Sequence, residues 1–378
     1  MRAALIPYIV LAVSLIACKG DDDPSGTAGE NGRHIGSESG RPQDTELIDQ
    51  WTIYFESSDE GLWEDNADRI VVYELSGNLY ELDDLNVPIY SPFAIRCHSD
   101  TIFISDAGAK QIVAMDDGGS VLWKAGDEGE GPGHFSMVTT LAVSDDYIAA
   151  LNMHLRRIEL FNRDGSFSHS LEIVRPQDIV AVDDTTFVVA STEQPGGDFH
   201  IVDADRGVIR SFGEANIEEY ENIFRPDLVR LCLNDNGRLA AFNRYEGLLA
   251  IYDIETEEPI YIGSREYPVT PTPPRPITDE DGQERTMSFP IGGNAYLGLK
   301  GMLNVVVCNY MEDGSFISDP DYLDFAPVTC IDRYDWNGNY LDSYCLPDSC
   351  INFVAALPDG RLVGRNFAEG VIKVFDVK

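Results

Sequence analysis

A phrase of two β-strands joined by a short turn recurs along this chain, and it constrains the fold more than any other feature. The copies read DTIFISDAGAKQIVAMDDGG, DYIAALNMHLRRIELFNRDG, TTFVVASTEQPGGDFHIVDADRG, GRLAAFNRYEGLLAIYDIETEE, MLNVVVCNYMEDG with VTCIDRYDWNGN, and GRLVGRNFAEGVIKVFDVK. A polar residue ends the first strand of each copy: Asp106, Asn152, Thr192, Asn243, Asn309 and Asn366. The chain is therefore built from repeated units of one kind.

A further β run precedes each copy, and a fourth run follows each copy except the last. The preceding runs include FAIRC and TLAV, and the following runs include SVLWKA and PIYIGS. Four short strands per unit are typical of a β-propeller blade. The sequence therefore predicts an all-β, six-bladed β-propeller with four antiparallel strands in each blade. A β-sandwich with many hairpins is the alternative fold.

The two ends of the repeat region favour a closed ring. The sixth copy stops at Lys378, where the other copies turn into a fourth strand. We expect an N-terminal strand in the last blade, formed by residues 47–54, because such pairing removes an exposed sheet edge. Residues 69–90 are interpreted as a hairpin beside the first blade, or alternatively as part of an incomplete seventh blade.

The N-terminus has the pattern of an export signal. Arg2 precedes an apolar run from Ala3 to Ala17 that ends at Cys18. The run is too short and too abruptly ended for a good transmembrane helix. Leu15-Ile16-Ala17-Cys18 resembles a bacterial lipobox, which implies cleavage before Cys18 and lipid attachment to it. An ordinary secretory signal with an incidental cysteine is the alternative.

These patterns divide the chain into three parts. We predict a lipoprotein signal peptide over residues 1–17 and a lipidated, disordered tether over residues 18–44, which lacks apolar periodicity. The propeller covers residues 45–378, with insertions at about 264–292 and 311–326. The predicted location is the bacterial cell envelope, anchored by lipid, at the outer membrane on its periplasmic or outer side.

Charge excludes one class of partner. The chain has 65 acidic against 27 basic residues and a formal net charge of −38. Such a field repels phosphate backbones, so nucleic acid is not expected as a partner. Solubility is the simplest role of the acidic surface.

The repeated phrase also carries a family likeness. The order of elements in the phrase resembles the NHL-type repeat. It consists of a strand, Asp or Asn, a short turn, a basic residue, Ile, a second strand and Phe-Asp-x-x-Gly. Gly129–Phe135, GEGPGHF, resembles the GxGPGEF segment of a bacterial lipoprotein family, the six-bladed β-propellers, with His134 where that family usually has an acid. The resemblance spans about residues 45–378. It implies a six-bladed propeller on a lipid anchor, and it implies no settled activity.

Strand direction predicts where a ligand would bind. Strands a to d of a blade alternate in direction, so the b-to-c turns and the d-to-a linkers emerge at one end of the ring. Loops on a rigid scaffold often bind ligands, although Asn and Asp at strand ends also cap turns. The candidate binding face consists of Asp106, His134, Asn152, His154, Arg156, Arg157, Asn243, Arg244, Tyr245, Asn309, Arg365 and Asn366.

No catalytic set and no cofactor are predicted from the sequence. The six histidines do not recur at one position of the repeat, whereas zinc requires three or four converging ligands. There is no GxSxG elbow and no phosphate loop. Calcium held by the Asp and Asn residues of several blades is an alternative, as in lactonase-like propellers.

Cysteines beyond Cys18 number six, and export would permit disulfides. Cys345 and Cys350 are the first disulfide candidates because a short loop separates them. Cys308 and Cys330 are a second candidate pair across neighbouring strands, depending on register. Cys97 and Cys232 fall in blades far apart and are expected to be buried free thiols.

The sequence therefore supports three functional hypotheses, of which the third is a structural subunit of an envelope complex. The first is an exported, membrane-anchored scaffold that binds a protein, peptide or carbohydrate through its loop-rich face and is not an enzyme. The second is a metal-dependent propeller enzyme, a lactonase-like hydrolase or lyase, with its site at the mouth of the central channel.

Overall fold

The computed structural model describes thirteen segments of the chain. They are residues 70–72, 79–81, 89–191, 195–213, 229–244, 248–264, 275–278, 284–287, 292–298, 301–310, 328–349, 351–366 and 371–375. The predicted signal peptide and the predicted tether, with Cys18, lie outside them. No helix among the described residues has the length and apolar character needed to cross a membrane.

Six antiparallel sheets form the fold, and each contains one copy of the repeated phrase. Blade one consists of β3 (Pro92–His98), β4 (Thr101–Asp106), β5 (Gln111–Asp116) and β6 (Val121–Ala125). Blade two consists of β7 (Val138–Val143), β8 (Tyr147–Asn152), β9 (Arg157–Asn162) and β10 (Phe167–Glu172). Blade three consists of β11 (Pro176–Ala181), β12 (Thr186–Ser191), β13 (Phe199–Asp203) and β14 (Gly207–Phe212).

The remaining three blades follow the same order. Blade four consists of β15 (Val229–Leu233), β16 (Arg238–Asn243), β17 (Leu248–Asp253) and β18 (Pro259–Ser264). Blade five consists of β21 (Gly292–Leu297), β22 (Leu303–Tyr310), β23 (Val328–Tyr334) and β24 (Tyr340–Ser349). Blade six contains β25 (Ile351–Ala356), β26 (Leu362–Asn366) and β27 (Val371–Phe375).

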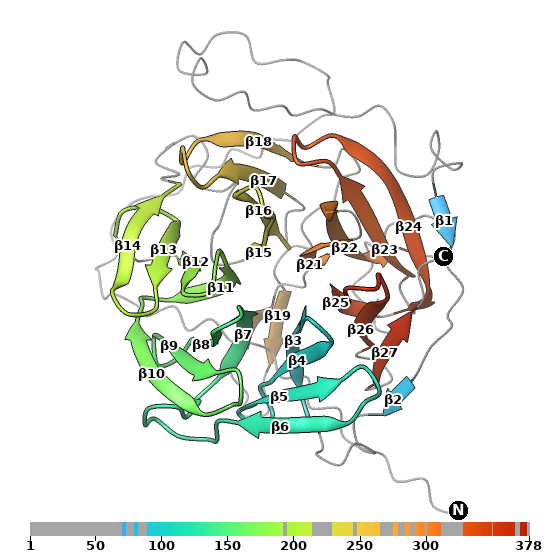
Figure 1. The fold of residues 1–378 in the computed structure, drawn as a ribbon. Coiled ribbons are helices and arrows are strands. Elements are labelled where there is room, and N and C mark those ends of the chain that lie inside the picture. Colours follow the sequence, from blue (N-terminus) through green and yellow to red (C-terminus); the bar gives the residue numbers. More distant parts are fainter. Residues whose placement is uncertain are drawn as a thin grey trace, which may run out of the picture. The chain divides into compact units, whose positions relative to one another are not determined.

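The innermost strands of the blades close a ring. β3 contacts β7, β7 contacts β11, β11 contacts β15, β15 contacts β21, β21 contacts β25, and β25 returns to β3 (Figure 1). This arrangement is a six-bladed β-propeller, so the predicted fold class is confirmed and the sandwich alternative is wrong.

An N-terminal strand completes the last blade, as predicted, but the residues that form it are not the expected ones. β2 (Leu79–Glu81) pairs antiparallel with β27 and supplies the fourth strand of blade six. β1 (Ile70–Val72) pairs in parallel with β24 as a fifth, outer strand of blade five. Residues 69–90 therefore form neither the predicted hairpin nor a seventh blade, because their two strands extend two different sheets. Residues 47–54, expected in this position, lie outside the described part of the chain.

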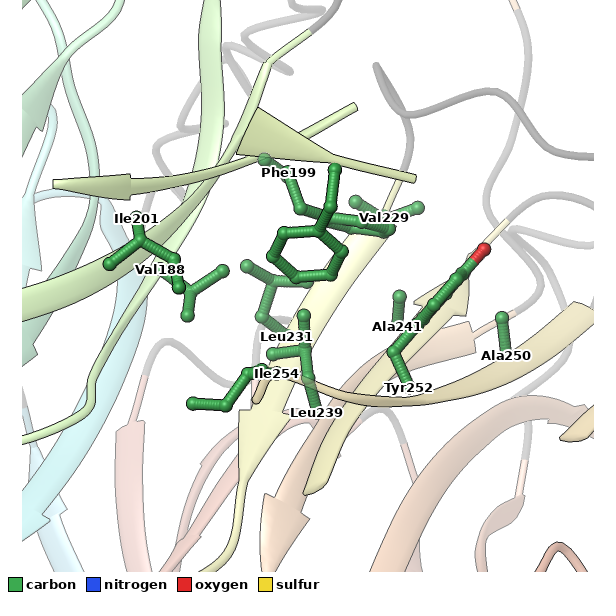
Figure 2. Close-up of a cluster of buried hydrophobic side chains, with 12 residues drawn as sticks. Val188, Phe199, Ile201, Val229, Leu231, Leu239, Ala241, Ala250, Tyr252 and Ile254 are labelled. Carbon is green, nitrogen blue, oxygen red and sulfur yellow. The ribbon is translucent and has the colours of Figure 1, made fainter. Parts of the chain in front are cut away.

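The core lies between neighbouring blades. Central strands are buried on both faces, as in β12, where five consecutive residues from Phe187 to Ser191 are buried. One cluster joins blades three and four: Phe199 packs on Tyr252 with ring centroids 5.2 Å apart, beside Leu231 (Figure 2). Burial of such aromatic side chains removes much apolar surface from water and fixes each blade against the next.

A short antiparallel hairpin falls within the predicted insertion between β18 and β21. It consists of β19 (Arg275–Thr278) and β20 (Glu284–Met287), and it belongs to a separate compact unit. The second predicted insertion, residues 311–326, lies outside the described residues.

Candidate functional site

The register places the predicted turn residues at one end of their blades. In four blades the predicted turn residue is the last residue of strand b and pairs with the first residue of strand a: Pro92↔Asp106, Val138↔Asn152, Val229↔Asn243 and Ile351↔Asn366. We call this the linker end, because the d-to-a linkers arrive there beside the b-to-c turns. Asn309 and Asn366 are described by backbone alone, and Tyr245 lies outside the described residues.

Asp106 binds the backbone of its own blade. Its buried carboxylate accepts hydrogen bonds from the backbone N–H groups of Tyr90 and Ser91, at 2.9 and 2.8 Å, and from Gly108 and Ala109, at 3.0 and 3.3 Å. Gly108 has no room for a side chain, since a Cβ there would lie 2.7 Å from that of Tyr90. Asp106 therefore closes its turn and fixes the segment leading into blade one, as turn chemistry alone would require.

Side chains of blade two bind the glycine-rich linker, Gly129–Phe135, that leads into this blade. Asn152 Nδ2 donates to the carbonyl of His134 at 2.9 Å. Arg157 Nη2 donates to the carbonyls of Glu130 and Gly131, at 3.0 and 3.2 Å. These contacts connect strands β8 and β9 to the linker, so this loop has a defined position.

Glu159 is the innermost support of this linker. Its fully buried carboxylate accepts the backbone N–H of Gly133 at 3.1 Å and a hydrogen bond from Ser170, and it pairs with Arg157 at 3.0 Å. Gly133 has a φ of 75°, and a Cβ there would lie 2.9 Å from the ring of Phe167. A buried charge of this kind requires its partners, so the linker and β9 are tied together.

Three basic side chains remain on the surface of this assembly. His134, His154 and Arg156 are exposed. The ring of His134 lies against Gly129 and Gly131, where an added Cβ would approach it to 3.3 and 3.2 Å. His154 Nδ1 lies 3.3 Å from the hydroxyl of Ser136. Arg156 has a φ of 54°, in the left-handed region, and ends the b-to-c turn. We call His134, His154 and Arg156 the exposed trio.

Three further predicted residues whose side chains the structure describes, Asn243, Arg244 and Arg365, are held within the fold. Asn243 is fully buried, and Arg244 is half-buried and interacts with its surroundings. Arg365 Nη1 donates to the carbonyl of Pro92 at 2.5 Å, across the boundary between blades six and one. Burial lowers the pKa of Arg365 to about 10, against the opposing effect of the Asp106 charge. The structure therefore brings most predicted residues to one end, and of those whose side chains are described only the exposed trio is exposed.

A polar network that the sequence did not reveal links blades one to four near the axis. Arg96 Nη2 of β3 lies 3.3 Å from the Thr140 hydroxyl and 3.2 Å from Oδ1 of Asp178. Thr140 donates to the same oxygen at 2.7 Å, and the N–H of Leu231 donates to Oδ2 at 2.7 Å. Because Asp178 is fully buried with both oxygens engaged, this network acts as a clasp between blades.

A repeated position of buried ionisable residues in strand c was also not predicted from the sequence. Three blades bury an ionisable residue three positions before the Asn or Asp of their c-to-d turn: Glu159, His200 and Asp332. His200 Nδ1 lies 2.8 Å from the Ser211 hydroxyl, and burial lowers the pKa of His200 to about 4. The available signal was a polar residue interrupting the apolar run of strand c at a fixed distance from the turn.

The opposite end of the blades repeats one contact. The carboxylate Oδ1 of Asp203 accepts backbone N–H bonds from residues 205 and 206, and that of Asp253 from residues 255 and 256. Asp335 binds the N–H groups of residues 337 and 339 in the same way. The Asp of the repeated phrase is therefore a turn cap.

The cysteines are described in part. Cys97 and Cys232 are free, and burial raises the pKa of each thiol to about 12. Cys308, Cys330 and Cys345 are described by backbone alone, and Cys350 lies outside the described residues. Among the residues whose side chains are described, no three His, Cys, Asp or Glu residues gather as metal ligands would.

Comparison with known proteins finds no relative by sequence. No known protein family and no curated protein matches this sequence. A hydrazine synthase chain from Kuenenia stuttgartiensis is 13% identical, with 78% of each chain covered and a TM-score of 0.48. The WD40 repeats of RRP9 are 12% identical over 81% of this chain and 100% of theirs, with a TM-score of 0.49. Virginiamycin B lyase from Staphylococcus aureus is 11% identical over 80% of this chain and 100% of its own, with a TM-score of 0.47. Similarity at this level transfers no residue role to this chain.

Proposed function

We propose that this protein is an exported, lipid-anchored scaffold that binds a protein, peptide or carbohydrate at the linker end of its propeller. The observation that carries the proposal is the exposed trio, His134, His154 and Arg156, standing on loops fixed by buried polar contacts. Side chains held on rigid loops lose little conformational freedom when they bind, and this favours affinity.

The chemistry of the trio suits a polar ligand. A guanidinium group donates in a planar fork, and imidazole both donates and accepts at neutral pH. In a chain of net charge −38, the trio places one guanidinium group and two imidazole groups on the surface of the linker end. Pairing with carboxylate, sulfate or hydroxyl groups of a ligand is the expected mode of contact.

Binding can be tested with a triple variant and a matched control. His134→Ala, His154→Ala and Arg156→Ala together should abolish capture of glycans or envelope proteins by the purified chain. The control replaces three exposed acids of the opposite end: Asp146→Ala, Asp184→Ala and Asp205→Ala. Equal binding by wild type and the trio variant would overturn the proposal. Stoichiometric calcium or zinc in the purified protein would instead favour the enzymatic hypothesis.

Anchoring is tested separately. Metabolic labelling with an alkyne fatty acid should mark the wild-type chain in the membrane fraction, and Cys18→Ser should remove both the label and the membrane association. An unlabelled wild-type chain would exclude the lipid anchor while leaving the binding face untouched.

A further inference from the structure

The register of blade five brings two cysteines together that are fifteen positions apart in the sequence. Cys330 of β23 and Cys345 of β24 are direct partners across the antiparallel pair. Residues in such a pair have Cα atoms about 4.5–5.5 Å apart and share one face of the sheet. Disulfides require Cα separations of about 4.4–6.8 Å. We propose that Cys330 and Cys345 form a disulfide that links strands β23 and β24 of blade five.

The same register disfavours the alternative for Cys330. On its other side Cys330 pairs with Val307, and Cys308 is the next residue along β22. Successive residues of a strand occupy opposite faces of a sheet. Cys308 is therefore placed on the face opposite Cys330, at the point where the register of β22 and β23 shifts.

Cys345 is likewise placed by its strand. It lies within β24, which extends from Tyr340 to Ser349. An extended strand advances about 3.3 Å per residue, which separates a residue from one five positions later unless the chain folds back. Residues 346–349 contain a register shift but remain in the strand. The partner directly across β23 is therefore favoured for Cys345 over Cys350.

The covalent step is an ordinary thiol–disulfide exchange. Two thiols of the chain react with one external disulfide, such as oxidised glutathione, through a mixed disulfide in which one sulfur of the chain is bonded to one glutathione. Attack by the second thiolate forms the Cys330–Cys345 bond and releases the second glutathione, so one disulfide is consumed and two glutathione thiols are produced. Oxidation of this kind is normal outside the cytoplasm, and the inference is independent of which ligand the linker end binds.

Proteolytic mapping without reduction can assign the bond. Cleavage before aspartate separates all four cysteines of this region: residues 324–331 carry Cys330, 342–347 carry Cys345, 348–358 carry Cys350, and 281–312 carry Cys308. The full chain is folded with oxidised and reduced glutathione, its free thiols are alkylated, and it is then digested. The expected product joins 324–331 to 342–347 and disappears on reduction.

Other products would overturn the proposal. These are a link from 324–331 to 281–312, a link from 342–347 to 348–358, or recovery of both Cys330 and Cys345 in alkylated form. A second measurement uses Cys330→Ser, Cys345→Ser and the double variant. Each single change should lower the midpoint of thermal unfolding under oxidising conditions, and the double variant should fall no further than a single one, since both remove the same bond. Cys97→Ser, a change at a cysteine that is free in the structure, is the control and should leave the peptide link intact.

Discussion

The two ends of the propeller carry the same kinds of polar residue, but these residues make different contacts at each end. At the c-to-d turns, an Asp carboxylate accepts two backbone N–H groups in blade after blade, as at Asp203, Asp253 and Asp335. At the linker end, equivalent polar residues make different contacts in each blade. Asp106 binds four N–H groups, whereas Asn152 reaches the carbonyl of His134.

The difference indicates which residues hold the fold and which are available to a ligand. A contact that recurs in three of the turns is explained by the turn itself. Where the contacts change between blades, side chains such as those of His154 and Arg156 are not needed to form the turn. Both side chains are exposed. The linker end is therefore where specificity is expected, and each prediction below can weaken or sharpen this contrast.

The largest effect is expected for Glu159→Ala. The substitution removes the carboxylate that holds the N–H of Gly133 and leaves Arg157 without its partner inside the linker assembly. Breaking a buried ion pair costs about 3–5 kcal/mol of folding free energy. Urea unfolding followed by circular dichroism measures the loss. The control is Glu130→Ala on the exposed side of the same linker, where a change within about 0.5 kcal/mol is expected. Equal losses of folding free energy in the two variants would show that the buried contacts of Glu159 do not hold the linker.

The fold could be read from the sequence because its period is local. Each blade carries its own strands and turns. In the second copy, for example, the first strand ends at Asn152 and the copy itself ends at Gly165, and this pattern predicts a four-strand unit without knowledge of distant contacts. The closing strand could not be found in this way. β2 has three residues, Leu79–Glu81, and its place is set by the free edge of β27 rather than by its own pattern.

The site was predictable in position but not in detail. Strand direction placed Asp106, Asn152 and Arg157 at the linker end, as the structure has them. Whether each side chain is buried or exposed depends on its contacts with the neighbouring blade. The sequence pattern of a single blade does not contain those contacts. Arg96 and Asp178 illustrate the limit, since their ion pair joins residues of two blades that are not adjacent.

A pH effect of intermediate size is expected from His200. Its folded-state pKa of about 4 lies below the ordinary value of about 6.5, because burial disfavours the charged imidazole. The unfolded chain therefore binds more protons between these values, and stability rises with pH from about 4 to 6.5. The rise attributable to this group is at most about 3 kcal/mol.

His200→Leu isolates the contribution of His200. Urea midpoints measured at several pH values should show a smaller slope between pH 4 and 6.5 in this variant than in the wild type. An unchanged slope would mean that other groups cause the dependence. Ser211→Ala is the control: it keeps the imidazole of His200 and removes only the hydroxyl 2.8 Å from Nδ1, so the slope should remain.

A smaller effect is expected at the opposite end, in the pKa of Asp203. A hydrogen bond from the Arg206 side chain holds the pKa of Asp203 at about 2, and backbone N–H groups assist. Stability linked to this carboxylate is present above its unfolded pKa of about 4 and is lost as pH falls through about 2. Arg206→Ala should raise this pKa, measured by carbon NMR of the carboxyl group, while the backbone contacts keep it below the ordinary value. A return to the ordinary value would show that the turn N–H groups contribute nothing.

The smallest effect on stability is expected for Arg156→Gly, and it tests the contrast most directly. Arg156 and Lys110 end the b-to-c turns of blades two and one, and both have φ in the left-handed region, 54° and 57°. Glycine adopts this region without strain but is more flexible when unfolded, so the two effects nearly cancel to within about 1 kcal/mol. Lys110 has an additional duty, because its Nζ donates to the carbonyl of Ala107 at 3.0 Å. Lys110→Gly should therefore destabilise the protein more than Arg156→Gly in the same urea titration. If the two variants lose the same stability, the Arg156 side chain has a turn-forming role, and the linker end differs less from the opposite end than its contacts indicate.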